Sequence, residues 1–260
     1  MIFADLAALR ETFSRFGVRS AFFQHPARTM RVVAMAVAVA LMAVPVAAAG
    51  RTVTIHSDDG RAITATLFEA NHLPAPAIVL IPALGHPRDE WQGIAQRFAE
   101  QNITALTIDL PAAVLPADGA QLAGWSSYVR GAVTWLNGQP NVRPGSIALA
   151  GASLGGSLAA AAAATDPRIR ALALISPSSD YRGLRIEGSL RQVGSRPVLF
   201  ITSRKDPYAM RSARDLAKDA PGPRETFFGD AASHGVPLLA AEPDLARMLV
   251  DWFQRALGVN

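Results

Sequence analysis

Runs of apolar residues recur along residues 51–257 and alternate with longer stretches that have helical spacing. Two alternating runs, 52–56 and 62–68, flank the turn residues Asp58-Asp59-Gly60 and predict an antiparallel hairpin. The next run, 77–81, is apolar throughout, as expected of a strand covered on both faces. Further strands are predicted at 103–108, 146–150, 171–175, 197–202 and 225–228.

Helices are predicted between these strands, at 88–101, 120–136, 154–164 and 208–217, and after the last strand, at 243–257. This alternation predicts a single α/β domain with a mostly parallel sheet and helices on both faces. Catalytic groups then gather at the carboxyl ends of the strands. Only about 20 residues, Pro177 to Arg196, separate the strands at 171–175 and 197–202. Because they provide room for one short helix at most, we expect a minimal cap and an open site.

The N-terminal segment has the order typical of a signal peptide. A continuous apolar run, Val32 to Ala49, follows Arg28 and Arg31 and ends in three alanines before Gly50. We expect cleavage after Ala49 and export to the periplasm or the medium, so that residues 1–49 form the leader and 50–260 the folded domain. Met30 is an alternative start, and an uncleaved run of 18 residues is long enough to anchor the chain in a membrane.

Charge follows the same division of the chain. Residues 1–49 hold five arginines, one aspartate and one glutamate, which leaves 20 basic and 19 acidic residues in the rest. A nearly neutral domain argues against nucleic-acid binding. The chain has no cysteine, so a lipoprotein anchor is excluded and the domain needs no disulfide in an oxidising compartment.

The sharpest chemical signal is the run Gly151-Ala152-Ser153-Leu154-Gly155-Gly156, where an apolar strand gives way to an alanine-rich helix. This is the G-x-S-x-G pattern of a nucleophile elbow, and a plain Gly/Ser turn is the alternative interpretation. The elbow holds its serine in a tight turn, and neighbouring side chains would collide with backbone there. We therefore predict that Ser153 is a nucleophile.

A base and an acid should follow the serine, each from its own strand end. His234 is the one histidine after Ser153, and imidazole can serve as the base near neutral pH. Six aspartates lie between them, at 166, 180, 206, 215, 219 and 230. Asp206 closes a strong apolar strand through a short turn and is the predicted acid; Asp180 and Asp230 remain alternatives.

An oxyanion hole needs two backbone N–H donors that point at the substrate oxygen. Leu154, directly after the nucleophile, should supply one, and Leu84, in the loop after the strand at 77–81, should supply the other. His86 in the same loop is a candidate substrate contact or an exposed loop histidine. Trp91 is more typical of core or pocket wall. No histidines or carboxylates have the spacing of a metal site, so we expect neither metal nor organic cofactor.

Taken together, these motifs resemble the α/β-hydrolase superfamily over residues 51 to 257, in outline its small dienelactone-hydrolase-like and esterase branch. Many relatives carry His-Gly where this chain has Pro82-Ala83, and dienelactone hydrolases proper use a cysteine nucleophile, which this chain lacks. The resemblance implies an α/β-hydrolase fold and a serine hydrolase that acts on small-molecule carboxylic esters through an acyl-enzyme. A peptidase or acyltransferase shares that intermediate, and a non-catalytic binding protein on the same scaffold is the third hypothesis.

Overall fold

The computed structural model describes residues 50–111, 118–219 and 221–259. The expected leader, 1–49, and the apolar run within it therefore lie outside the described residues. In the described part of the chain no helix is both long enough and apolar enough to span a membrane.

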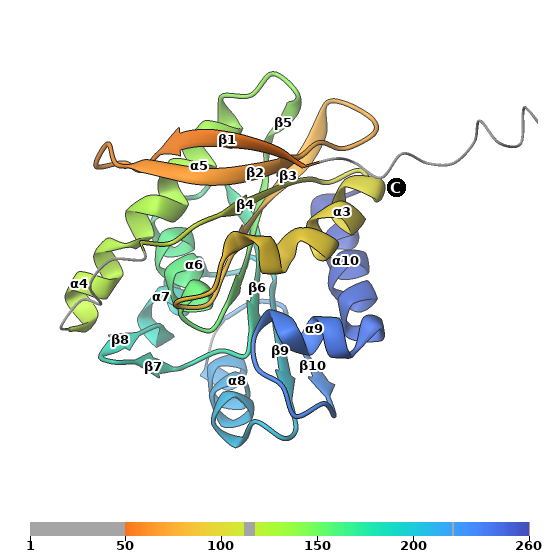
Figure 1. Cartoon of the computed structure of the whole chain (residues 1–260). Coiled ribbons are helices and arrows are strands. Elements are labelled where there is room, and N and C mark those ends of the chain that lie inside the picture. Colours follow the sequence, from red (N-terminus) through yellow and green to blue (C-terminus); the bar gives the residue numbers. More distant parts are fainter. Residues whose placement is uncertain (1–49, 112–117, 220, 260) are drawn as a thin grey trace, which may run out of the picture. The chain divides into compact units, whose positions relative to one another are not determined.

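An eight-stranded sheet forms the centre of the domain, with strand order β1-β2-β4-β3-β5-β6-β9-β10 (Figure 1). The two pairings that involve β2 are antiparallel, and the five pairings from β4 to β10 are parallel. The strands are β1 Arg51–His56, β2 Ala62–Phe68, β3 Ala75–Ile81, β4 Thr104–Ile108, β5 Val142–Ala152, β6 Ile169–Ile175, β9 Val198–Ser203 and β10 Arg224–Gly229. This mostly parallel sheet confirms the predicted fold class.

Helices connect the strands and cover the sheet on both sides. They are η2 Arg88–Trp91, α3 Gln92–Glu100, α4 Gly119–Gly124, α5 Ser126–Asn137, α6 Leu154–Thr165, α7 Glu187–Val193, α8 Pro207–Asp219, α9 Val236–Ala241 and α10 Pro243–Leu257. A small hairpin of β7 Asp180–Tyr181 and β8 Leu184–Arg185 lies between β6 and α7.

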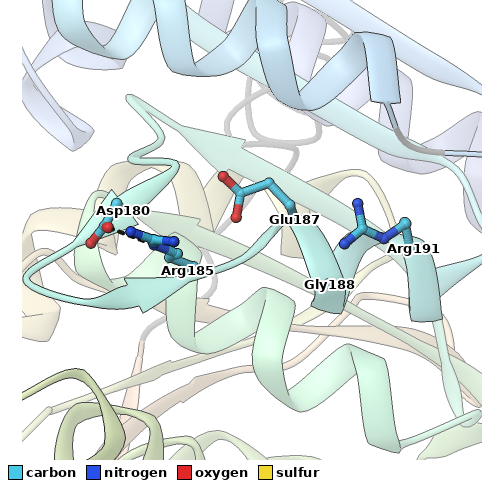
Figure 2. A pocket seen from close by; sticks show the side chains of 5 residues that line it. All are labelled: Asp180, Arg185, Glu187, Gly188 and Arg191. Atoms are coloured by element: carbon cyan, nitrogen blue, oxygen red, sulfur yellow. Dashed lines mark hydrogen bonds and ion pairs between the residues drawn. The ribbon is translucent and has the colours of Figure 1, made fainter.

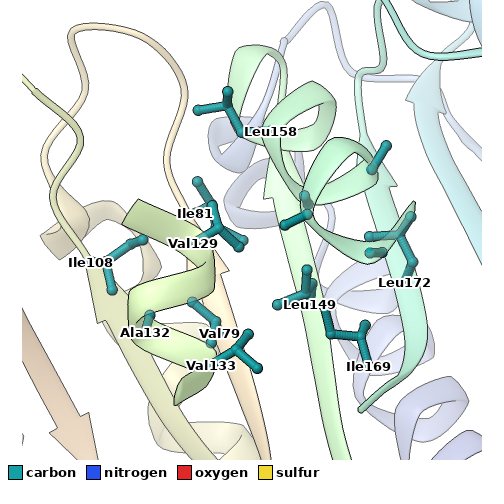
Figure 3. Packing of buried hydrophobic residues seen from close by; sticks show 14 of the residues in the cluster. Val79, Ile81, Ile108, Val129, Ala132, Val133, Leu149, Leu158, Ile169 and Leu172 are labelled. Atoms are coloured by element: carbon teal, nitrogen blue, oxygen red, sulfur yellow. The ribbon is translucent and has the colours of Figure 1, made fainter. Parts of the chain in front are cut away.

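The buried side chains form two clusters, one on each face of the sheet, because side chains along a strand point alternately to opposite faces. On β3, Val79 and Ile81 belong to the cluster under α5, α6, α7 and α8, whereas Ile78 and Leu80 belong to the cluster under α3, α9 and α10. Figure 3 shows α5 and α6 packing their apolar side chains against the first of these faces. Each fully buried aliphatic side chain contributes about 2 kcal/mol to folding.

Two parts of the fold differ from the sequence prediction. The helix expected at 120–136 is two helices, α4 and α5, that meet at Trp125. Trp125 lies in the turn between them, and its side chain is buried in the core cluster under α5 and α6. The segment between β6 and β9 contains one short helix, as expected, and also the β7–β8 hairpin.

Candidate active site

Ser153 lies at the junction of β5 and α6 with φ 51° and ψ −118°, a backbone conformation rare for a residue with a side chain. The glycines on either side allow it. A Cβ on Gly151 would lie 2.3 Å from the carbonyl oxygen of Gly155, and a Cβ on Gly155 would lie 2.4 Å from that of Pro82. Neither distance is tolerable for a real side chain. The elbow is therefore formed by close backbone packing, and it presents Ser153 beside the loop that follows β3.

Asp206 and His234 are in direct contact. Nδ1 of His234 lies 2.6 Å from Oδ2 of Asp206, although 28 residues separate them in sequence. The other carboxylate oxygen of Asp206 accepts a hydrogen bond of 3.0 Å from the backbone N–H of Ala209 in the first turn of α8. Asp206 is largely buried, with 19% of its side chain exposed, whereas half of the His234 side chain is exposed. The carboxylate thus fixes the imidazole from one side and leaves its Nε2 side open.

The two alternative acids have other partners. Asp180 lies in the β7–β8 hairpin and forms an ion pair of 2.9 Å with Arg185. The hydrogen bond from Arg185 lowers the pKa of Asp180 below its usual range. Asp230 forms an exposed ion pair of 3.0 Å with Arg204. Among the three aspartates considered, the structure places Asp206 against the histidine.

Ser153 and His234 come from neighbouring segments. A Cβ on Gly235, next to His234, would lie 3.7 Å from Cβ of Ala152, next to Ser153. Within the described residues there is no hydrogen bond between the Ser153 hydroxyl and the imidazole. Hydrogen bonds of this kind are often long in ligand-free sites and shorten when substrate binds. The structure brings the elbow of Ser153 and the loop of His234 together, and the serine hydroxyl forms no hydrogen bond within the described residues.

The two predicted oxyanion donors lie on segments that touch. Gly155, directly after Leu154, packs its Cα against the carbonyl groups of Ile81 and Pro82, at the start of the Leu84 loop. That loop turns at Gly85, which has φ 74°. The backbone N–H of His86 donates a hydrogen bond of 3.2 Å to the carbonyl of Ala83. In the described part of the chain, neither Leu84 N–H nor Leu154 N–H has a hydrogen-bond acceptor.

His86 and Trp91 have different environments. The His86 ring is half exposed, and its Nδ1 pairs with Glu90, whose second carboxylate oxygen is buried without a hydrogen-bond partner. Trp91 is fully buried in the cluster under α3, α9 and α10. Trp91 is thus core, whereas His86 stays accessible at the rim of the Leu84 loop.

An open pocket of about 720 Å³ lies against the insertion between β6 and β9, and its lining is mostly charged (Figure 2). The lining residues are Asp180, Arg185, Glu187, Gly188 and Arg191. None of the residues predicted for catalysis lines this pocket. The insertion nevertheless contacts α8, which follows Asp206: the Tyr208 hydroxyl donates a hydrogen bond of 2.9 Å to the carbonyl of Asp180.

Sequence reasoning missed the groups that hold the histidine loop. Ser176, Ser203 and Glu242 each bond to the backbone of residues 230–235. Ser176 directly follows the apolar strand β6 and Ser203 is the last residue of β9, but this position alone does not show that either hydroxyl bonds to a distant loop. Among the described residues, no three histidine or carboxylate side chains gather closely enough to hold a metal ion.

The sequence profile of the alpha/beta hydrolase family matches residues 78–258, which is most of the chain and includes the elbow, Asp206 and His234. The chain belongs to the alpha/beta hydrolase family. A polyketide transferase of a Penicillium species is 33% identical over 131 residues, 48% of this chain and 44% of that protein. A thiohydrolase of Arthrinium phaeospermum is 33% identical over 126 residues, 46% of this chain and 40% of that protein. This alpha/beta hydrolase therefore spans less than half the length of these two curated relatives.

Solved structures show the same fold. The dienelactone hydrolase of Anabaena variabilis superimposes with a TM-score of 0.69 at 20% identity, over 80% of this chain and 98% of that one. The likeness extends over nearly the whole of that protein, so the described domain shares its fold.

Proposed function

We propose that this alpha/beta hydrolase is a serine hydrolase that cleaves small carboxylic esters. Ser153 is the nucleophile, His234 is the base, and Asp206 is the carboxylate that orients the histidine. The observation that carries the proposal is the 2.6 Å contact between Asp206 and His234 beside an elbow that holds Ser153 at a positive φ. The family membership and the esterase-type fold support it.

The first half-reaction follows from the roles of these three groups. The Ser153 oxygen attacks the ester carbonyl while Nε2 of His234 takes the hydroxyl proton. Asp206 accepts the hydrogen bond from Nδ1–H, which leaves Nε2 unprotonated for that transfer, and its charge stabilises the imidazolium that forms. The imidazolium then gives its proton to the leaving alcohol. This step yields an acyl-enzyme on Ser153.

Negative charge develops on the carbonyl oxygen during both half-reactions. We assign its stabilisation to the N–H groups of Leu154 and Leu84, both without an acceptor in the described part of the chain. One such donor is worth about 100- to 1000-fold in rate. Water, activated by His234, completes the cycle by hydrolysing the acyl-enzyme. We expect the short insertion to leave the site open, which favours small or extended esters over a long buried acyl chain.

Labelling with a fluorophosphonate tests this proposal. Residues 50–260 should react at a single serine, and Ser153→Ala and His234→Ala should both abolish the reaction while circular dichroism shows an unchanged fold. Absence of labelling in the folded wild type would contradict the catalytic assignment and favour a non-catalytic binding role.

Acyl transfer is a second candidate function. One of the two curated relatives, the polyketide transferase, favours it, whereas the other is a thiohydrolase. An acyl-enzyme releases its acyl group to whichever nucleophile reaches it, so the two functions differ only in the second half-reaction. Incubation with an acetyl thioester or p-nitrophenyl acetate, with and without an added alcohol or amine, distinguishes them. Both reactions release the thiol or p-nitrophenol, but hydrolysis leaves the acetyl group as acetate, whereas transfer yields the acetylated acceptor.

We also propose that the domain 50–260 is exported and that residues 1–49 are its leader. The support is the apolar run after two arginines and the three alanines at its end. N-terminal sequencing of the protein from a periplasmic or secreted fraction should give Gly50. A protein found in the membrane fraction with residues 32–49 intact would instead indicate the anchor, and a cytosolic protein with Met1 intact would contradict export.

A further inference from the structure

The loop that carries His234 is held by hydrogen bonds at both ends. At its start, the backbone N–H groups of Asp230 and Ala231 both donate to one carboxylate oxygen of Glu242. The buried hydroxyl of Ser203, the last residue of β9, donates to the carbonyl of Ala231. These contacts fix the start of the loop, at residues 230 and 231.

The other end of the loop is held by one hydroxyl. Oγ of Ser176 accepts a hydrogen bond of 2.9 Å from the backbone N–H of Gly235, the residue directly after His234. Ser176 is 1% exposed, and this bond is the only hydrogen bond that its side chain makes among the described residues. Without it, the Gly235 N–H would be buried and unpaired.

The backbone of Ser176 is itself tightly constrained. Its φ is 48°, in the left-handed region that residues with a side chain rarely adopt. Its backbone N–H donates a hydrogen bond of 2.7 Å to the carbonyl of Ile201 on β9. A serine retained in such a conformation requires surrounding contacts that hold it there. The left-handed turn points the hydroxyl at the histidine loop instead of letting the chain continue along β6.

The end of β6 also holds the backbone of the nucleophile. The carbonyl of Ile175 accepts 2.9 Å from the backbone N–H of Ser153, while the next residue, Ser176, bonds to Gly235. One dipeptide at the end of β6 therefore contacts the elbow with its first residue and the histidine loop with its second. The dipeptide therefore links the backbone of the elbow to the backbone of the histidine loop.

We propose that Ser176 is a positioning residue that sets the distance between the His234 imidazole and the Ser153 hydroxyl. The inference rests on the proposed function of those two residues. Ser176 touches no reacting atom; it acts through the backbone of Gly235. A displacement of about 1 Å between a base and a nucleophile can cost about 100-fold in rate, so the loss of this bond should slow acylation much more than it weakens substrate binding.

The experiment compares Ser176→Ala and Ser176→Gly with the wild type. Both variants remove the hydroxyl, but glycine adopts a positive φ freely, so the pair separates the hydroxyl from backbone strain. We expect both to lower the second-order rate of fluorophosphonate inactivation, and kcat on p-nitrophenyl acetate, about 10- to 100-fold, with KM nearly unchanged. Ser157→Ala is the matched control, because Ser157 is equally buried and its hydroxyl has no hydrogen-bond partner.

Rates are measured well below the melting temperature of each variant, so that a lower stability alone would leave them unchanged. Wild-type rates in either folded Ser176 variant would overturn the inference, as would an equal loss in Ser157→Ala. Hydrogen exchange of the peptide 229–236 gives a readout independent of activity, and removal of the hydroxyl should speed its exchange. If the wild type is not labelled but the Ser176 variants exchange faster, the proposed function is contradicted and the Ser176 contact is supported. If exchange in the variants is unchanged, the contact itself is contradicted.

Discussion

The carboxylate of Asp206 lies 2.6 Å from Nδ1 of His234, and these residues follow two neighbouring parallel strands, β9 and β10. Because the carboxyl ends of parallel strands meet at one edge of a sheet, residues far apart in sequence become partners there. The relationship explains why an aspartate at the end of an apolar strand was the better candidate than aspartates in helices or longer loops.

Asp206→Asn should lower kcat on p-nitrophenyl esters about 10,000-fold, because an amide can stabilise the wrong imidazole tautomer and cannot balance the imidazolium charge. The measurement is steady-state kinetics after an unfolding curve has shown that the variant is folded. Asp230→Asn serves as control, since Asp230 pairs with Arg204 on the surface, and its kcat should stay within about twofold of the wild type. If kcat falls strongly in Asp230→Asn and only slightly in Asp206→Asn, Asp230 and not Asp206 is the catalytic carboxylate.

Gly155→Ala should destabilise the domain by about 3 kcal/mol or reshape the elbow, because the new Cβ would lie 2.4 Å from the Pro82 carbonyl and 2.6 Å from that of Ile81. Urea unfolding measures the first effect and the rate of fluorophosphonate labelling the second. Gly93→Ala is the control: Gly93 lies in α3 with open space where its Cβ would be, so alanine should stabilise the domain by about 0.5 to 1 kcal/mol. A neutral Gly155→Ala would show that the elbow has room to relax.

His86→Ala should raise KM for ester substrates a few-fold and leave kcat nearly unchanged, if the exposed ring at the rim of the Leu84 loop contacts bound substrate equally in the ground and transition states. His72→Ala is the matched control. His72 is also exposed and also bonded to a neighbour, Asn102, but it precedes β3 at the opposite end of the sheet. Equal KM values in both variants and the wild type would remove His86 from the substrate contacts.

Acid should weaken the domain partly through Asp166, a buried residue after α6. Burial acts to raise the pKa of Asp166, but the hydrogen bonds and charge of Arg168 outweigh it, so the pKa lies below its usual 3.8. Because the folded pKa is the lower one, the carboxylate stabilises the fold fully above about pH 4, and this contribution is lost as the pH falls through the folded pKa.

The free energy lost in Asp166→Asn should accordingly be larger at pH 7 than at pH 3, as measured by urea unfolding at both values. Asp215→Asn, at an exposed position on α8, should have a small effect at either pH. A loss in Asp166→Asn that does not change with pH would show that Asp166 acts through hydrogen bonds alone and not through its charge.

Local patterns predicted the strands well, because apolar runs that end in turn residues have few alternative structures. They could not show that the helix expected at 120–136 is interrupted at Trp125, whose side chain is buried in the core. The two-residue strands β7 and β8 are too short to produce any periodicity, and α9, which begins after the positive φ of Gly235, was also missed. In each case tertiary contacts decide the structure.

For the site, chain order and strand ends were enough to select Ser153, Asp206 and His234 as candidates, and the structure places them on adjoining loops. The ion pairs that Asp180 and Asp230 form with Arg185 and Arg204 depend on folding and have no signature in the sequence. The role inferred for Ser176 has none either, because a serine after an apolar strand looks the same whether its hydroxyl is bonded to a distant loop or solvated.

The insertion between β6 and β9 leaves and rejoins the sheet at adjacent strands, and its first residue follows Ser176, whose N–H is bonded to Ile201. Its two ends are therefore already close together before any of its own structure forms. Doubling the length of such a loop adds only about 0.6 kcal/mol of closure entropy. This segment is consequently an exchangeable module: a longer lid could be grafted there by recombination, to change which substrates enter, while the strand ends that hold Ser153 and His234 stay as they are.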